Sequence, residues 1–302
     1  MARSGRSGWR YLFWQWAPSM ADPPWIRSAP VAIALIFPVV VIFSVPSRSA
    51  SSTDWHVREA KTVVVDGVEE VWQLRWLDKP HSSCGPDGGD ANLTCPCSGF
   101  AYGLKGQIAL VRKRKGHPDE RLNLAAAFPN EYPNGRDQKQ KAEVTIQQWA
   151  PVLEGPDSDL NHAEDDDFAA RVERRPPVEL MQFGDFDHDG GATEFLIQVS
   201  TLPCGKHQMA LFGISRSNPH LHVFSTVENP KAPLVLGNWE WDALLRSNGR
   251  VSVTDWNCDD HGSDAEWRIE MEARNGVLHA KNVGFSCPTG GTARTAVSTQ
   301  IR

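Results

Sequence analysis

The sequence predicts a mainly β fold. Short runs in which apolar and polar residues alternate with a period of two recur along the chain, and this is the pattern of half-buried strands. Turn-forming pairs such as Asp66-Gly67 and Asn275-Gly276 separate neighbouring runs, as they do in β-hairpins. Only residues 238–247 combine a helical spacing of apolar side chains with helix end signals. Many short strands, close turns and a single short helix are typical of an all-β domain.

The first 50 residues differ from the rest in composition. Residues 29–46 carry no charge and follow four arginines that only Asp22 opposes. An uncharged apolar run behind a basic flank indicates either an export signal or an N-terminal membrane anchor. Ser47 and Ser49 supply small residues that suit signal cleavage, so a cleaved signal is the first expectation and an anchor is the alternative.

The start of the chain has two interpretations. The stretch ahead of the apolar run is long for a signal, and translation from Met20 instead of Met1 would leave Arg27 as the basic flank. Under either start, residues 51–302 are expected to be exported, whether secreted, periplasmic or anchored to the outer face of a membrane. Membrane contact is expected only through residues 29–46, if they are not cleaved.

The charge balance argues against nucleic acid as a partner. The chain has 302 residues and a formal net charge of −6. Residues 1–50 hold five basic residues and one acidic residue, so residues 51–302 alone carry a formal charge of −10. Proteins that bind nucleic acids present basic surfaces to the phosphates, and this composition does not predict one.

The cysteine content fits an exported protein. An even number of cysteines in such a chain indicates disulfide bonds, although their pairing stays open. The six cysteines are Cys84, Cys95, Cys97, Cys204, Cys258 and Cys287. The alternative for Cys95-Pro-Cys97 is a metal or redox site, but the pair lacks the spacing of a redox motif and has no second ligand pair.

After the export segment, residues 61–76 predict a β-hairpin. Trp72, Leu74 and Trp76 fall on one face of its second strand. Aromatic residues in a row can form a platform for sugars, but their alternation with polar residues favours a face that packs in the core.

The middle of the chain predicts loops and further strands. Residues 80–99 are rich in Gly, Pro, Asp and Ser and predict a long loop. The basic run Arg112–Lys115 on an acidic chain indicates a solvated strand end. Residues 154–177 are acidic and loop-like, which predicts either a boundary between two halves or a mobile acidic loop. The remaining strand-like runs lie at 107–112, 122–128, 144–149, 195–200, 209–215, 221–227, 251–254, 267–271 and 277–283. The helix at 238–247 has Asn238 as its expected N-cap.

One segment combines spaced carboxylates with glycines. Asp185, Asp187 and Asp189 stand at loop positions 1, 3 and 5, and Gly190 at position 6 permits a sharp turn that directs the carbonyl of Gly191 toward the same point. Oxygen ligands at this spacing suit Ca²⁺. The alternative is an acidic turn that binds nothing, although its carboxylates would then repel one another.

The order strand, acidic loop, strand at residues 183–200 resembles the FG-GAP repeat, the blade unit of integrin-type β-propellers, whose loops run Asp-x-Asp/Asn-x-Asp-Gly-x-x-Asp. This sequence departs from that pattern at the last ligand, because Thr193 stands at position 9 and the carboxylate follows at Glu194. The resemblance implies a Ca²⁺ site completed by Glu194, a propeller or part of one, and an exported module that binds a protein or polysaccharide. A β-sandwich or an irregular two-sheet domain is the alternative architecture.

A second candidate for Ca²⁺ lies near the C-terminus. Asp255, Asn257, Asp259 and Glu266 occupy positions 1, 3, 5 and 12 of a count like that of an EF-hand. Position 6 is Asp260 and not glycine, which does not favour the sharp turn of such loops.

Three kinds of function fit the sequence. The first is a non-enzymatic exported module in which Ca²⁺ rigidifies a loop. The second is a secreted hydrolase: serine-, zinc- and cysteine-hydrolase motifs are absent, whereas the acid pair of a glycosidase leaves no spacing signal. The third is a structural envelope protein without a ligand. His207, His220 and His222 are the remaining candidates for chemistry, the last two either as a transition-metal pair or as a surface pair at a strand end.

Overall fold

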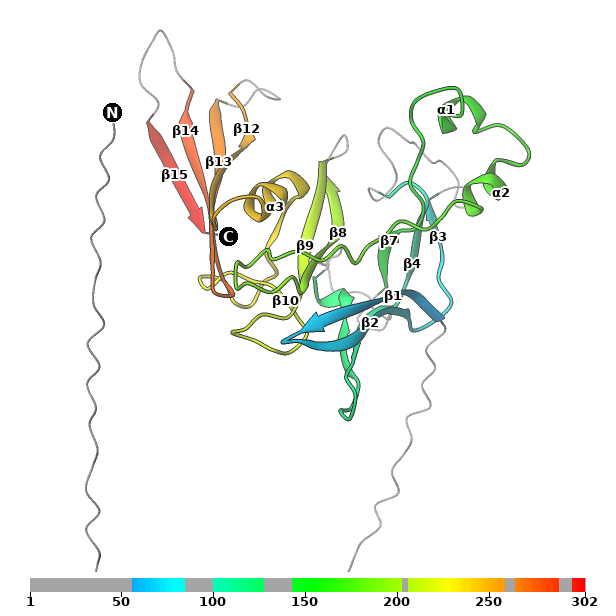
Figure 1. The fold of residues 1–302 in the computed structure, drawn as a ribbon. Helices are drawn as coiled ribbons and strands as arrows, with labels where there is room; N and C mark the ends of the chain where they lie inside the picture. The colour runs from blue at the N-terminus through cyan, green and yellow to red at the C-terminus, as the bar shows by residue number, and fades with distance from the viewer. Residues whose placement is uncertain are drawn as a thin grey trace, which may run out of the picture. The chain divides into compact units, whose positions relative to one another are not determined.

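The computed structural model describes residues 56–84, 100–127, 143–202, 206–258, 264–287 and 295–301. Residues 51–302 form one compact unit, and strands dominate the described part of it, so the mainly β prediction is confirmed. The described strands form four antiparallel sheets, none of which is closed (Figure 1). The predicted signal or anchor at residues 1–50 lies outside the described residues.

The first sheet has the strand order β1-β2-β5-β6. It consists of β1 (His56–Val65), β2 (Val68–Trp76), β5 (Ile108–Lys113) and β6 (Glu120–Asn123). Strands β1 and β2 form the predicted hairpin, with positive φ at both Asp66 (49°) and Gly67 (79°). Two positive φ angles in a two-residue turn match the twist of the flanking strands, which explains the Asp-Gly pair.

The second and third sheets follow along the chain. The second has the order β3-β4-β7, with β3 (His81–Cys84), β4 (Gly103–Gly106) and β7 (Val144–Gln147). In the third, β9 (Lys206–Gly213) pairs with β8 (Glu194–Leu202), β10 (His222–Val223) and β11 (Val235–Gly237). Short connections between these elements keep the acidic loop that precedes β8 close to several of them.

The fourth sheet is an up-and-down meander of β12 (Arg250–Trp256), β13 (Ala265–Arg274), β14 (Val277–Ser286) and β15 (Ala296–Ile301). Its central turn is the predicted Asn275-Gly276 pair. Cys258 and Cys287 lie at disulfide distance, with Cα atoms 5.6 Å apart. The side chain of Cys84 and the whole of Cys95, Cys97 and Cys204 lie outside the described part of the chain, so their pairing stays a prediction.

Helix α3 (Asn238–Leu245) confirms the predicted helix, although Gly237 and not Asn238 is its N-cap. The prediction of 154–177 as a loop without helices is wrong, since α1 (Asp159–His162) and α2 (Phe168–Glu173) form there. None of the described helices is long and apolar enough to cross a bilayer.

Contacts that are distant in sequence stabilise the α1–α2 segment. Asp159 is buried, its Oδ2 accepts a hydrogen bond from the Tyr102 hydroxyl (3.2 Å), and both its oxygens bind the Arg175 guanidinium. Phe168 and Val172 of α2 pack against Tyr102 in a small apolar cluster. Short helices that lack strong local signals form here because tertiary packing stabilises them.

The predicted strand at 122–128 also ends early. Strand β6 stops at Asn123, and Leu124–Ala127 form a 3₁₀ turn. The Asn123 side chain accepts a hydrogen bond from the Ala125 nitrogen (2.9 Å). Asn, which competes for backbone donors, is a common residue at such a change of direction.

The sheet of β8 and β9 is buried on both faces. Phe195, Ile197 and Val199 face one apolar cluster, which includes Trp72, Leu74 and Trp76 of β2 together with side chains of β5 and β7. On the other side, Leu211 packs with Trp241 of α3 and with apolar residues of β13 and β14. Figure 1 shows β8, β9 and α3 between the β12–β15 sheet and the strands β1, β2 and β7.

The burial of β2 settles one open point. Trp72, Leu74 and Trp76 are each 0% exposed, so they are core residues and not a platform for sugars. The core prediction is confirmed.

Candidate metal centre

The acidic loop lies where the two large apolar clusters approach each other. Before the loop, Phe183 packs edge-on against Trp72 and Phe195, with ring centroids 5.5 and 5.3 Å apart. Inside the loop, Phe186 packs edge-on against Trp241 of α3 at 6.1 Å. The loop is therefore fixed by aromatic contacts to both clusters.

Backbone hydrogen bonds close the loop at its base. Gly184 and Glu194 form an isolated antiparallel bridge, with N···O distances of 2.9 and 3.3 Å. The chain turns through positive φ at His188 (52°) and Gly190 (92°). Positive φ is strained for most residues but not for glycine, which explains Gly190 at the sixth loop position.

Three carboxylates converge inside the loop. Asp185, Asp187 and Glu194 each offer one oxygen, and these oxygens lie within 4.8 Å of one another. Glu194 is 0% exposed and accepts hydrogen bonds from the Phe186 nitrogen (2.9 Å) and the Thr193 hydroxyl (2.6 Å). These three residues are predicted ligands that the structure brings together, and they include the shifted carboxylate of Glu194.

Asp187 lacks a partner for one of its oxygens. The side chain is 0% exposed, and Oδ1 accepts a hydrogen bond from the Asp189 nitrogen at 3.2 Å. Oδ2 is buried and has no hydrogen-bond partner among the described residues. A buried oxygen without a partner is costly, and next to two other carboxylates its natural partner is a cation or a proton.

Burial and mutual repulsion perturb the two buried acids. Desolvation, followed by the charges of Asp189 and Asp185, raises the pKa of Asp187 from 3.8 to about 7. Desolvation, followed by the charge of Asp187, raises the pKa of Glu194 from 4.5 to about 8. A divalent cation among these groups would favour their charged forms and remove the penalty.

Asp189 has a different role from the one its spacing predicts. Its Oδ1 accepts a hydrogen bond from the Gly191 nitrogen (2.8 Å), and its Oδ2 accepts one from the Arg216 nitrogen (2.6 Å). It does not belong to the close group of three carboxylates. Asp189 thus fixes the loop to the connection after β9, and the Gly191 carbonyl as a ligand stays a prediction.

The loop also binds the fourth sheet and α3. The carbonyl oxygens of Asp187 and His188 accept hydrogen bonds from the turn residues Gly276 (3.2 Å) and Asn275 (3.3 Å). The His188 ring nitrogen Nε2 lies 3.0 Å from the Leu244 carbonyl oxygen at the end of α3. An ion in the loop would therefore stabilise contacts between parts of the chain that are far apart in sequence.

The second candidate site is only partly described. Asp259 lies outside the described residues, and Cys258 beside it pairs with Cys287. Glu266 is buried, and its Oε1 accepts a hydrogen bond from Arg268 Nε at 2.7 Å. Asp255 and Asn257 are described, but they join no group of three candidate metal ligands there.

The predicted histidine pair also belongs to no such group. His222 Nδ1 lies 2.8 Å from the His220 carbonyl oxygen, and His220 Nδ1 lies 3.3 Å from a carboxylate oxygen of Glu120. His207 Nδ1 lies 2.8 Å from Gln198 Oε1. These contacts use ring nitrogens that a transition metal would need.

One basic residue is placed against expectation. Arg112 is 3% exposed, so its assignment to a solvated strand end is wrong. Its guanidinium binds both carboxylate oxygens of Glu70, at 2.5 and 2.9 Å, and the Pro219 carbonyl at 2.6 Å. The sequence contained the signal, a basic run on an acidic chain, but Glu70 and Pro219 are remote in sequence.

Comparisons with known proteins give no match. No family model matches the chain, and neither the curated proteins nor the solved structures include a match to it. The resemblance to the FG-GAP repeat therefore stays a prediction based on the loop and its flanking strands.

Proposed function

We propose that residues 51–302 are an exported, non-enzymatic binding module in which the loop at 185–194 holds one structural Ca²⁺. The observation that carries this proposal is the buried Oδ2 atom of Asp187, which has no hydrogen-bond partner and lies beside the carboxylates of Asp185 and Glu194. Three acids in a desolvated loop form a favourable arrangement only when a cation or protons neutralise them.

The geometry suits calcium. Ca²⁺ binds oxygen ligands at 2.3–2.6 Å in flexible geometry, so two ligands on opposite sides of the ion are roughly 5 Å apart. The oxygens of Asp185, Asp187 and Glu194 lie within 4.8 Å of one another, and they can contact one ion without a large rearrangement of the loop. Backbone carbonyls and water would complete its coordination.

Burial favours a structural ion over a catalytic one. Asp187 and Glu194 are both 0% exposed, so a substrate cannot reach the carboxyls whose pKa values are raised. The same loop contacts α3 and the β13–β14 turn through hydrogen bonds. The ion's effect is to fix these contacts.

The architecture we propose is propeller-like. It is supported by four small antiparallel sheets and by the β12–β15 meander, which has the strand order of a propeller blade. The interleaving of β3 and β4 between strands of the first sheet is a departure from a regular blade order.

Isothermal titration calorimetry tests the proposal. The protein is treated with EDTA, exchanged into metal-free buffer and titrated with CaCl₂ and, separately, with MgCl₂. We expect one Ca²⁺ per chain with a dissociation constant on the order of 10⁻⁴ M and weaker binding of Mg²⁺. Asp187→Asn should abolish the Ca²⁺ signal, while Asp157→Asn, which removes an exposed acid, should leave it unchanged. Equal binding by wild type and Asp187→Asn, or no binding by either, would reject a calcium site in this loop.

A further inference from the structure

A cleft of about 650 Å³ borders the proposed calcium loop. Its walls are the tip of the β1–β2 hairpin, the turn after β5, the loop residues 189–193 and the connection at 214–219. This volume lies in the ordinary range of ligand-binding pockets.

The cleft has basic groups without ion-pair partners. Arg112 is neutralised by Glu70 in its wall. Arg114, Lys115 and Arg216 also line the cleft, and none of them forms an ion pair within the described residues. On a domain whose formal charge is −10, three such cations at one place call for an anionic ligand.

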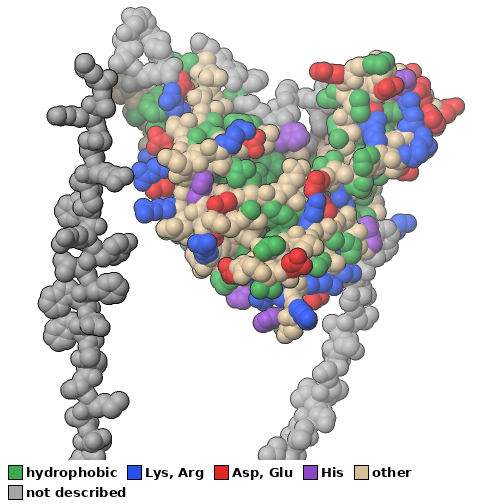
Figure 2. Space-filling view, viewed as in Figure 1, with side chains coloured by type: hydrophobic (Ala, Val, Ile, Leu, Met, Phe, Trp, Pro, Cys, Tyr) green, Lys and Arg blue, Asp and Glu red, His purple; other side chains and the backbone are tan. Residues whose placement is uncertain are grey.

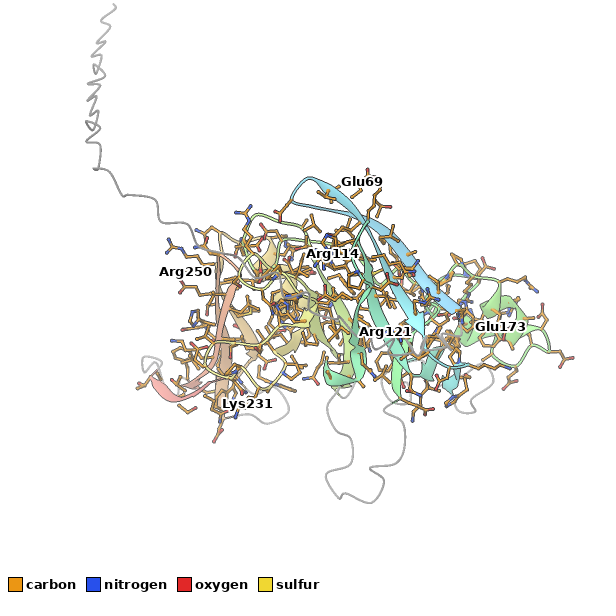
Figure 3. All side chains as sticks on the ribbon, turned by 90° about the horizontal axis from the view of Figure 1, so that it is seen from below. Glu69, Arg114, Arg121, Glu173, Lys231 and Arg250 are labelled. Carbon is orange, nitrogen blue, oxygen red and sulfur yellow. A yellow bond between two sulfur atoms is a disulfide. The ribbon has the colours of Figure 1, made fainter. Side chains whose placement is uncertain are left out.

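Two details position these cations. The Nε atom of Arg114 is buried and has no hydrogen-bond acceptor among the described residues. The Arg216 guanidinium lies over the loop, with its Nη2 atom 3.4 Å from the position that a Cβ on Gly190 would occupy. Figure 3 shows Arg114 near Glu69 of the β1–β2 hairpin, and Figure 2 shows Lys and Arg side chains at the lower tip of the molecule.

A free strand edge lies at the same cleft. Strand β1 is the end strand of its sheet, and in the described part of the chain the backbone of Thr62–Val65 bonds only to β2. Val64, which lines the cleft, and Val68 are 60% and 59% exposed. Unpaired edges with apolar side chains accept an added strand from another chain.

We propose that this cleft binds an extended acidic peptide segment of a partner protein, which adds to the edge of β1 and places carboxylates against Arg114, Lys115 and Arg216. The open edge supplies backbone donors and acceptors, the valines supply apolar contact, and the cations supply charge complementarity. The described lining contains no Trp, Tyr or Phe, the residues on which sugars stack, so a peptide fits better than a polysaccharide.

Calcium should strengthen this binding, and this part of the inference rests on the proposed function. Asp189 links the two sites because its oxygens accept hydrogen bonds from Gly191 in the loop and from Arg216 in the cleft. An ion that orders the loop also orders the backbone of Arg216. The charge complementarity itself does not depend on the ion.

Fluorescence polarisation tests the inference on the full exported unit, residues 51–302. The probes are a fluorescein-labelled decapeptide of alternating Glu and Val, its counterpart of alternating Lys and Val, and labelled polygalacturonate. We expect the acidic peptide to bind, and Arg114→Glu and Arg216→Glu each to weaken its binding about tenfold or more. Lys231→Glu makes the same charge change at an exposed site far from Arg114 (Figure 3) and should alter binding less than about twofold.

The outcomes separate the two proposals. Binding of the acidic peptide that survives both EDTA and Asp187→Asn supports the cleft and rejects its coupling to calcium. The inference is overturned if the acidic peptide fails to bind at millimolar concentration in calcium, if polygalacturonate binds instead, or if the Lys231 variant loses as much affinity as the cleft variants. Circular dichroism and melting of each variant identify loss of folding, and Arg114→Gln and Arg216→Gln replace any charge reversal that unfolds the protein.

Discussion

Asp187→Asn should stabilise the calcium-free protein while it removes the response to calcium. In the wild type at pH 8 without metal, a buried carboxylate faces two other acids within 4.8 Å. The asparagine keeps the oxygen that accepts from the Asp189 nitrogen. Its amide group replaces the oxygen that lacks a partner and can donate to Asp185 or Glu194.

The size of each effect follows from the structure. The pKa of Asp187 rises from 3.8 to about 7, which corresponds to a ceiling of ~4 kcal/mol of lost stability at pH 8. Relaxation and the shared repulsion with Glu194 reduce this, so we expect a gain of ~1–2 kcal/mol and a melting temperature higher by about 2–8 °C in EDTA. For the wild type, Ca²⁺ at tenfold excess over its dissociation constant adds ~1.4 kcal/mol, or about 3–6 °C.

Differential scanning calorimetry at pH 8, in EDTA and in 1 mM Ca²⁺, measures both effects. Asp189→Asn is the contrasting variant, because both Asp189 oxygens accept backbone hydrogen bonds and its loss should lower the melting temperature in either buffer. The reasoning is refuted if Asp187→Asn lowers the melting temperature in EDTA as much as Asp189→Asn does, or if its response to calcium equals that of the wild type.

Four further results are expected. Without calcium, stability should fall as pH rises from about 4 to about 8, since the two buried loop carboxyls have raised folded-state pKa values and keep protons that the unfolded chain has lost; saturating calcium should flatten this slope in urea titrations across pH. Arg175→Ala should cost ~3–5 kcal/mol, because it leaves the buried Asp159 carboxylate without its ion pair, and denaturant unfolding measures the loss; an effect below about 1 kcal/mol would contradict this. Reduction of the Cys258–Cys287 pair should cost on the order of 3 kcal/mol, seen as a lower melting temperature in reductant and not in the Cys258→Ser variant. Protein from the native host should lack residues 29–46 or be membrane-associated through them, and a cytosolic chain that begins at Met1 or Met20 would contradict export.

Local sequence signals specified the elements that depend on neighbouring residues. Asp66-Gly67 and Asn275-Gly276 turn the chain as predicted because φ > 0 at such pairs is a property of the residues themselves. Burial of Trp72 and its neighbours on β2 follows from a period of two, which holds for any half-buried strand.

The candidate metal centre was predictable in part for the same reason. Asp185, Asp187 and Glu194 lie within ten residues of one another, and a tight turn at Gly190 is enough to bring their oxygens together. Asp189 could not be assigned from spacing, because the group that holds it, the Arg216 nitrogen, lies 27 residues away in sequence.

Contacts between distant segments decided the rest. Helices α1 and α2 form in an acidic stretch because Asp159 binds Tyr102, 57 residues away in sequence. Arg112 is buried because Glu70, 42 residues away, neutralises it. The cleft exists only where a hairpin tip, a turn and the acidic loop meet, and no local pattern encodes such a meeting. Periodicity and turn chemistry act over a few residues, whereas the pairing of buried charges and the shape of a cleft depend on how the whole chain packs.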